Sequence, residues 1–323
     1  MAANLFLSRR LEQLLLGVLT KRYRALYFSS GIVIPTVADL EVGASEVVRE
    51  KIAEIGAAAI LAENANDIPV IDMEVGEDRY RVLMVASSVS YSMQQMRAME
   101  KAGNANMIDA RKMVIANRAI EEKDNKLAAF GSTPLGMTGF LNNGSVTINN
   151  SSFDFWAGAT TAKQMAEFIL DELAVVVNTS DGAEVPSDLL LSISLDRRLK
   201  SVQMSDNADR SVYEYLLANG ISSITPVPEC GAAKLEANGV LAGGTNKDRI
   251  VFYPREELGM VDPETEMPLP EVVERHIEPL QQAPMDFWET KNLRTVIPMF
   301  KCVTPTIVNY PSAMRYVNHA QAS

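Results

Sequence analysis

A long helix that follows an alternating, extended segment is the feature that most limits how this chain can fold. Apolar residues recur at helical spacing over 107–130, and Gly131 then supplies the residue that most often ends a helix. At about 1.5 Å per residue, such a helix would be ~36 Å long, close to the width of a small domain. Residues 121–126 are polar all round, so we expect one face to lie on a sheet and the other to face water. The expected apolar stripe consists of Met113, Ala116, Ile120 and Leu127.

The segment before this helix predicts a β-hairpin at about 69–85. Apolar and acidic residues alternate over 71–75, which is typical of a half-buried strand. Residues 80–85 are rich in β-branched and aromatic side chains and would form the return strand. A two-stranded ribbon is marginal in water by itself, so this one should be completed by contacts with a neighbour. The polar loop between its strands consists of Gly76, Glu77, Asp78 and Arg79.

Further helices and strands follow from the same patterns. Helical spacing predicts a helix at 45–60, with Asp39 or Ser45 as its N-cap. It predicts another at 162–177, with Thr160 or Thr161 as its N-cap. A third short helix is expected at 211–218. Strands are expected at 189–195, 221–227, 249–253, 294–297, 299–303 and 306–310. Prolines between 263 and 284 exclude one regular element there, and 239–248 is expected to be an exposed loop.

Charge is spread unevenly along the chain. Residues 1–24 carry five basic residues against Glu12 alone, a net charge of +4, while the whole chain carries −11. The remainder is therefore strongly acidic, which argues against general nucleic-acid binding by its surface. Two interpretations of the basic segment stay open. It contacts nucleic acid or an acidic patch on a neighbour, or it is the solvated face of an amphipathic helix.

The residues that usually carry enzyme chemistry are scarce. Cys230 and Cys302 lie too far apart in sequence for a disulfide framework or metal-ligand spacing. His276 and His319, the two histidines, are expected at the surface. The glycine-rich loops lack the lysine of a phosphate-binding loop, and no Gly-x-Ser-x-Gly sequence occurs. We therefore predict no enzyme activity and no catalytic, cofactor-binding or metal-binding residues. No apolar stretch approaches the ~20 residues of a membrane span, so no membrane partner is expected.

The order of the expected elements resembles the Hong Kong 97-type capsid fold of tailed phages, and several stretches are similar to the encapsulin-related phage coat protein family. These stretches are 81–91, 119–124, 130–141, 248–255 and 308–316. The resemblance covers nearly the whole chain, and the shared order of elements carries it.

The resemblance implies an α+β capsid fold with four parts. The first is an N-terminal arm at 1–40, and the second is an extended loop at 41–95 that contains the hairpin. A peripheral domain at 96–180 and 291–318 would hold the long spine helix. An axial α/β domain at 181–290 would be inserted into it.

The function implied by the resemblance is structural. The chain would be a major capsid protein that self-assembles into hexamers and pentamers of an icosahedral phage head, enclosing the DNA genome without sequence-specific binding. Its partners would be itself and scaffolding, portal and decoration proteins, with assembly in the host cytoplasm and a final place in the virion. Candidate intersubunit contacts are Gly76, Glu77, Asp78 and Arg79 in the hairpin loop and Arg9, Arg10, Arg22 and Arg24 in the arm.

Two alternatives remain open at this point. An encapsulin-type compartment has the same fold but encloses protein cargo, and this chain is longer than such shells usually are. A soluble hydrolase or transferase would use Cys230 or a serine. Electron microscopy of the expressed chain would separate the two shell-forming proteins, capsid and encapsulin, from a hydrolase or transferase. The packaged contents would then separate a phage head from a compartment.

Overall fold

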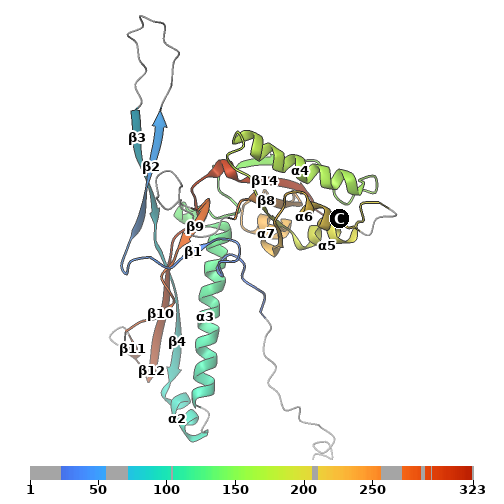
Figure 1. Ribbon diagram of the computed structural model, residues 1–323. Coiled ribbons are helices and arrows are strands. Elements are labelled where there is room, and N and C mark those ends of the chain that lie inside the picture. Colours follow the sequence, from blue (N-terminus) through green and yellow to red (C-terminus); the bar gives the residue numbers. More distant parts are fainter. Residues whose placement is uncertain are drawn as a thin grey trace, which may run out of the picture.

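The computed structural model describes residues 23–55, 72–102, 105–205, 210–255, 271–284, 288–291 and 293–321. This part of the chain forms two packed units and a ribbon that extends away from both (Figure 1). The long-helix unit is built on helix α3, and the five-stranded unit is built on a sheet with helices on both faces. Within the described residues, no helix combines the length and apolar character that spanning a bilayer requires.

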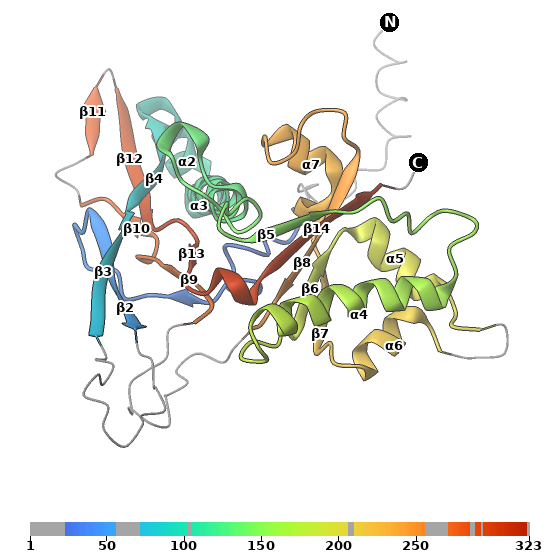
Figure 2. The same cartoon turned by 90° about the horizontal axis from the view of Figure 1, so that it is seen from above.

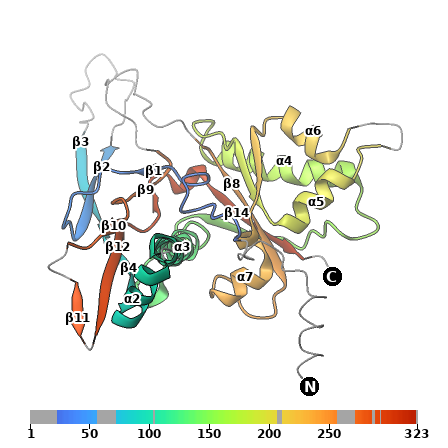
Figure 3. The same cartoon turned by 90° about the horizontal axis from the view of Figure 1, so that it is seen from below.

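The long-helix unit places one helix over a small antiparallel sheet. Its elements are β4 (Leu83–Ser92), α2 (Met93–Ala102), α3 (Ala105–Phe130), β10 (Gln281–Gln282), β11 (Glu289–Lys291) and β12 (Arg294–Val303). Strand β12 pairs with β4 over its full length, while β10 and β11 pair with its other edge. Figure 3 shows α3 beside β4 and β12. The predicted long helix is confirmed, and the two strands expected at 294–303 form one strand that runs through Pro298.

Alternate residues of the two strands form the core under α3. Their buried side chains pack against the helix stripe, whose members Ala116, Ile120 and Leu127 are buried as predicted. Burying one such aliphatic side chain stabilises a fold by roughly 1.5–3 kcal/mol. The buried strand residues are Val85, Val89 and Tyr91 of β4 and Ile297, Met299 and Val303 of β12.

The five-stranded unit has the strand order β5-β14-β8-β6-β7. Its strands are β5 (Thr147–Asn150), β6 (Asp188–Leu191), β7 (Ser223–Pro226), β8 (Lys247–Tyr253) and β14 (Arg315–Ala320). Its helices are α4 (Ala162–Thr179), α5 (Ile193–Ser201), α6 (Val212–Ala218) and α7 (Ala232–Ala237). Helices α4, α5 and α6 cover one face and α7 lies on the other (Figure 2). Both faces are buried, so β6 and β8 consist almost entirely of buried residues.

Several expectations for this unit are wrong in detail. The strand expected at 189–195 ends at Leu191, because Ser192 accepts a hydrogen bond from the Leu195 amide and caps α5. Strand β14 and helix α7 were not expected. The loop expected at 239–248 gives way to β8 at Lys247. Helix α4 is confirmed, and Thr161 is its cap through a reciprocal capping box with Gln164.

A third, three-stranded sheet joins the described part of the N-terminal segment to the body. Strand β1 (Thr36–Val37) pairs with β9 (Val273–His276), and β9 pairs with β13 (Ile307–Val308). The largest hydrophobic core continues from this sheet into both units, because it contains residues of the α3 end, of β8 and of β9. This cluster therefore connects the two units, each of which also has a core of its own.

The ribbon pairs differently from the expected hairpin. Strand β2 (Glu46–Ile55) pairs antiparallel with β3 (Asp72–Arg81), so the predicted helix at 45–60 is wrong within the described residues. Residues 76–79 are the middle of β3 rather than a loop. After Val82 the chain continues as β4, which pairs with β12 and not with β3. The connection between β2 and β3 lies outside the described residues.

Strand pairing also divides the chain differently from the expected domain boundaries. Strands β5 and β14 come from the ranges expected in the peripheral domain, yet they belong to the same sheet as β6, β7 and β8. Conversely, β9 and β10 lie within the range expected for the axial domain but pair with strands outside it.

The turn after α3 can be tested by a pair of glycine substitutions. Gly131 has a φ of +64°, and a Cβ there would overlap the backbone of Met137 and Thr138. We expect Gly131→Ala to lower the free energy of unfolding by about 2–4 kcal/mol, since left-handed strain and overpacking both contribute. Gly136 has a φ of +66° in open space and is the matched control, with an expected loss of about 1–2 kcal/mol. Equal losses in urea unfolding would contradict the overlap at Gly131.

The buried imidazole of His319 predicts a pH dependence of stability. Its ring lies 4.9 Å from Phe155 and 5.8 Å from Trp156 between centroids, and burial lowers its pKa below the ordinary value of 6.5. The unfolded chain therefore binds a proton more readily than the folded chain below that pH. The contribution of His319 is complete above about pH 6.5 and is lost as the pH falls toward the folded-state pKa. We expect His319→Phe to flatten the fall in unfolding free energy between pH 7.5 and 5.5, and an unchanged slope would refute this.

Candidate functional site

The two faces of the ribbon differ. Arg49 of β2 turns toward the body and forms an ion pair with Glu274 of β9. On the opposite face of the ribbon, Val48 and Val75 are 48% and 59% exposed. Alternation along a strand places these apolar side chains on the outward face together with Glu50 and Glu77, which are direct cross-strand partners. Arg79 lies on the same face and pairs with Glu77, so the part of this face that an isolated subunit leaves unsatisfied is its exposed apolar surface.

The four residues predicted at the hairpin loop lie instead along the exposed ribbon. Asp78 forms an ion pair with Lys51, whose ammonium holds the pKa of that carboxyl below its ordinary value. Arg79 lies 3.1 Å from Glu77, and Gly76 pairs with Lys51 across the strands. These residues are accessible to a neighbour, and their role as contacts stays a prediction.

The candidate contacts in the arm divide into two groups. Arg9, Arg10 and Arg22 lie outside the described residues. Arg24 is described, and its guanidinium lies 2.6 Å from the carboxylate of buried Glu229 while 47% of its side chain is exposed. This ion pair fixes the start of the described chain to the segment that precedes α7.

A clamp of polar side chains holds the base of the ribbon. Glu274 accepts from Arg49 and also from the Asn309 amide at 3.1 Å. His276, two residues after Glu274 on β9, lies 2.7 Å from Asp39 through its Nδ1. Sequence analysis placed His276 at the surface, but β1 and β2 cover it and it is 9% exposed.

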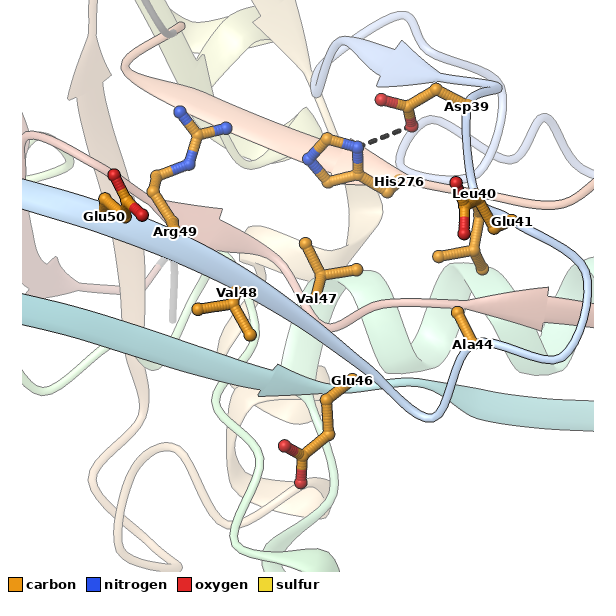
Figure 4. Close-up of a pocket in the computed structure, with 10 residues that line it drawn as sticks. All are labelled: Asp39, Leu40, Glu41, Ala44, Glu46, Val47, Val48, Arg49, Glu50 and His276. Carbon is orange, nitrogen blue, oxygen red and sulfur yellow. Dashed lines mark hydrogen bonds and ion pairs between the residues drawn. The ribbon is translucent and has the colours of Figure 1, made fainter.

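A pocket of about 560 Å³ lies beside this clamp, between the 39–41 segment and β2. Figure 4 shows Val47 and Arg49 pointing to the side of His276, while Glu46 points away. Carboxylates outnumber basic groups among the residues that line it, and its two basic side chains are already engaged by Asp39 and Glu274. The pocket therefore lies at the base of the ribbon.

A buried charge cluster on α3 ties the pieces together. Asp124 is fully buried and pairs with Arg275 of β9 and, at 2.9 Å, with Lys301 of β12. The neighbouring Asn125 accepts from the Phe28 amide at 2.9 Å and donates to Glu229 at 3.1 Å. One turn of α3 therefore holds β9, β12 and the described start of the chain. Sequence analysis missed this cluster, because the run 121–126 looked polar all round.

The described residues offer little for catalysis. No group of three His, Cys, Asp or Glu side chains with metal-binding geometry occurs among them. Cys230 is buried, and burial raises the pKa of its thiol. Burial likewise raises the pKa of Cys302 to about 11, so neither thiol forms a thiolate readily at neutral pH. His319 was expected at the surface, but it is fully buried in the five-stranded unit.

The described residues thus form a ribbon and two packed units, one of them built on a long helix whose C-terminal end lies in the cluster that connects the units. The profile of the major capsid protein family matches residues 56–319. The chain belongs to the major capsid protein family. Among curated protein sequences, none matches this chain.

Solved structures give the same fold. The capsid of Myoviridae phage XM1 is similar with a TM-score of 0.72 and 15% identity, covering 97% of this chain and 98% of that one. A chain of Gordonia phage Cozz gives a TM-score of 0.57 at 13% identity, covering 97% and 91%. The capsid of an empty GTA particle gives 0.53 at 13% identity, covering 99% and 98%. At these identities the likeness concerns the fold.

The family match and the fold together confirm the main expectations. The chain is a major capsid protein of a phage head with the Hong Kong 97-type fold. It is a structural protein that self-assembles into a shell and belongs in the virion. Neither the protein-cargo compartment nor the hydrolase or transferase is favoured, since the family and the matched capsids are those of phage heads and a GTA particle.

Proposed function

We propose that the β2–β3 ribbon is the element through which capsid subunits join into hexamers and pentamers, and that these rings close into an icosahedral head around DNA. The observation that carries this proposal is the outward face of the ribbon, where Val48 and Val75 are exposed on a strand pair that extends away from the body. Such a ribbon is marginal by itself and gains stability when a neighbour covers it.

The ribbon contacts would include the four residues 76–79, and the basic arm would supply a second contact through Arg9, Arg10, Arg22 and Arg24. Stable protein interfaces bury about 800 Å² per partner, which an extended ribbon can reach without enlarging the body. A contact between two different surfaces of identical chains gives a closed ring when the rotation between copies divides a full turn, and hexamers and pentamers have this symmetry.

The four parts expected from the sequence are kept in this proposal, but the boundaries between them follow the strand pairing. The long-helix unit corresponds to the peripheral domain and the five-stranded unit to the axial domain, with 1–40 as arm and 41–81 as extended loop. The DNA would be enclosed without sequence-specific binding, since the chain carries a net charge of −11. Scaffolding, portal and decoration proteins are further proposed partners, and assembly is proposed to occur in the host cytoplasm. We propose no enzyme activity.

Electron microscopy of the purified chain tests the assembly proposal. We expect closed shells with five-fold and six-fold clusters of subunits. A chain that stays monomeric at high concentration, by light scattering and by microscopy, would overturn it.

A further inference from the structure

One continuous segment, residues 24–39, runs from the five-stranded unit to the base of the ribbon, and we call it the strap. It begins at Arg24, whose guanidinium lies 2.6 Å from the carboxylate of Glu229 in the five-stranded unit. It ends at Asp39, whose carboxylate lies 2.7 Å from Nδ1 of His276 in the clamp. In sequence the basic arm precedes one end of the strap, and strand β2 of the ribbon follows the other.

The first part of the strap is fastened to the C-terminal half of α3 by polar side chains. The amides of Phe28 and Ser29 donate to the side-chain oxygen of Asn125, at 2.9 and 3.4 Å. Arg118, two turns earlier on α3, donates to the carbonyl of Arg24. Side chains of the helix therefore satisfy backbone groups of a segment that has no regular structure there.

The middle of the strap lies in the core that connects the two units. Phe28, Val33 and Ile34 are no more than 1% exposed, and all three belong to the cluster that also contains residues of α3, β8 and β9. The Phe28 ring lies 5.8 Å from the Phe140 ring between centroids. These side chains stay out of water only while the strap lies against the body, so the core depends on the strap being in place.

The last part of the strap pairs with β9. The amides of Arg275 and Ile277 donate to the carbonyls of Pro35 and Val37, at 3.1 and 2.9 Å. Strands β1 and β9 lie at the base of the ribbon (Figure 1). Strand β9 also carries the clamp carboxylate that binds the ribbon, so the strap pairs with the strand that holds the ribbon in place.

We propose that the strap is one cooperative element that couples the basic arm to the base of the ribbon, so that loosening it at either end loosens it at the other. Its two end contacts are partly exposed, since 47% of the Arg24 side chain and 55% of the Asp39 side chain are accessible to solvent. Its buried side chains lie within the seven residues 28–34, so one cannot leave the core without drawing the others out. Short segments of this kind open as units. The inference goes beyond the proposed function, because it concerns contacts within one subunit.

Glu229 and Asn125 carry a displacement of the arm into the strap. The Glu229 Oε1 accepts from Arg24 and, at 3.1 Å, from the Asn125 amide, while its buried Oε2 has no hydrogen-bond partner among the described residues. Moving Arg24 away leaves a buried carboxylate with the Asn125 amide alone, and an uncompensated buried charge is costly. Because the same Asn125 side chain also holds two amides of the strap, a shift of Glu229 reaches the middle of the strap.

Hydrogen exchange of unassembled subunits tests the coupling from the arm end. Arg24→Met removes the cation and keeps an apolar stem. We expect the amides of Arg275 and Ile277, which donate to the far part of the strap, to exchange at least tenfold faster than in the unchanged chain. Lys200→Met is the matched control, because the Lys200 side chain is 46% exposed and pairs with the mostly buried Asp196 on α5. This control should leave both amides unchanged.

The coupling should also be measurable from the ribbon end, because a coupling free energy between two sites is reciprocal. Asp39→Ala removes the contact with His276, and we expect the amides of Phe28 and Ser29 to exchange at least threefold faster. Glu41→Ala is the control, since it also removes a carboxylate that lines the pocket beside the clamp, and it should leave these amides unchanged.

Two results would overturn the proposal. Faster exchange confined to the residues next to each substitution would show that the strap opens piece by piece. An equal increase in the amides of β6, within the five-stranded unit, would show that the substitutions loosen the whole subunit and not the strap. If Arg24→Met yields no folded subunits, the comparison of Asp39→Ala with Glu41→Ala decides alone. Since exchange is measured on unassembled subunits, the outcome is independent of whether shells form.

Discussion

A capsid protein with a shortened ribbon should fold normally and form no shells. We would replace residues 51–76 by Asn-Gly, so that Glu50 and Glu77, which are directly opposite, are joined by a two-residue turn. The change keeps Arg49 on Glu274 and leaves all of β4 in place. Losing a subunit contact worth about 4 kcal/mol lowers an association constant about a thousandfold, which is enough to abolish closure of a shell. Electron microscopy and light scattering give the particle yield, and circular dichroism gives the fold.

Two further variants locate the effect on the outward face of the ribbon. Val48→Asp with Val75→Asp keeps the ribbon length but places charges on exposed apolar positions, and we expect it to reduce the particle yield strongly. Val185→Asp is the matched control, since Val185 is similarly exposed on the five-stranded unit. Shells formed by the shortened chain at the normal yield would show that the ribbon is not needed for assembly.

The clamp explains why a ribbon with few contacts can still be directed at a neighbour. Arg49, one quarter exposed, pairs with a carboxylate that is itself held by Asn309 and is 6% exposed. The ribbon is thus fixed near its base. A fixed base lowers the ordering cost of docking, because the direction of the ribbon is set before contact.

Elements whose signals are local were predictable from the sequence. The long helix shows a periodic apolar stripe and ends at Gly131, and α4 begins at Thr161 with Gln164 three residues later. These signals lie within a few residues of each other, so no knowledge of the tertiary structure is needed. The order of such elements also sufficed for the capsid fold, which the family match confirms.

Elements that depend on distant partners were not predictable. Residues 46–55 contain strong helix formers and place Val47, Val48 and Ile52 at helical spacing, yet pairing with β3 makes them a strand. Strand β14 contains Asn318 and His319, and its sequence did not predict a strand. It forms one because β5 and β8 pair with its two edges. The apolar alternation in β3 and β4 was visible, but their true partners are β2 and β12.

The buried charges were the largest omission at the candidate site. Asp124 and Asn125 lie in a run that looks like a solvated helix face. The partners of Asp124, Arg275 and Lys301, are more than 150 residues away in sequence. Those of Asn125, Phe28 and Glu229, are about 100 residues away. A carboxylate on a helix is usually exposed, and only the strands laid over this turn bury it. The same long-range packing buries His276, which sequence analysis placed at the surface.

Removing the charge of Asp124 should destabilise the subunit more than any other single substitution proposed for it. Asp124→Asn keeps the shape of the side chain but leaves Arg275, fully buried, without its carboxylate, and leaves Lys301 with Glu121 alone at 3.1 Å. Breaking a buried ion pair from one side costs about 3–5 kcal/mol, because a desolvated charge stays uncompensated. Urea unfolding of unassembled subunits measures this as a lower midpoint at an unchanged slope.

The matched control lies on the same helix. Glu122 pairs with Arg118 at 3.1 Å on an exposed face, so Glu122→Gln should cost no more than about 0.5 kcal/mol. Replacing the whole cluster by apolar residues, with Asp124→Leu, Arg275→Met and Lys301→Met together, should recover much of the loss, because no buried charge then remains unpaired. If Asp124→Asn cost as little stability as Glu122→Gln, the ion pairs of Asp124 would not be what fastens β9 and β12 to α3. Hydrophobic packing alone would then have to position the base of the ribbon.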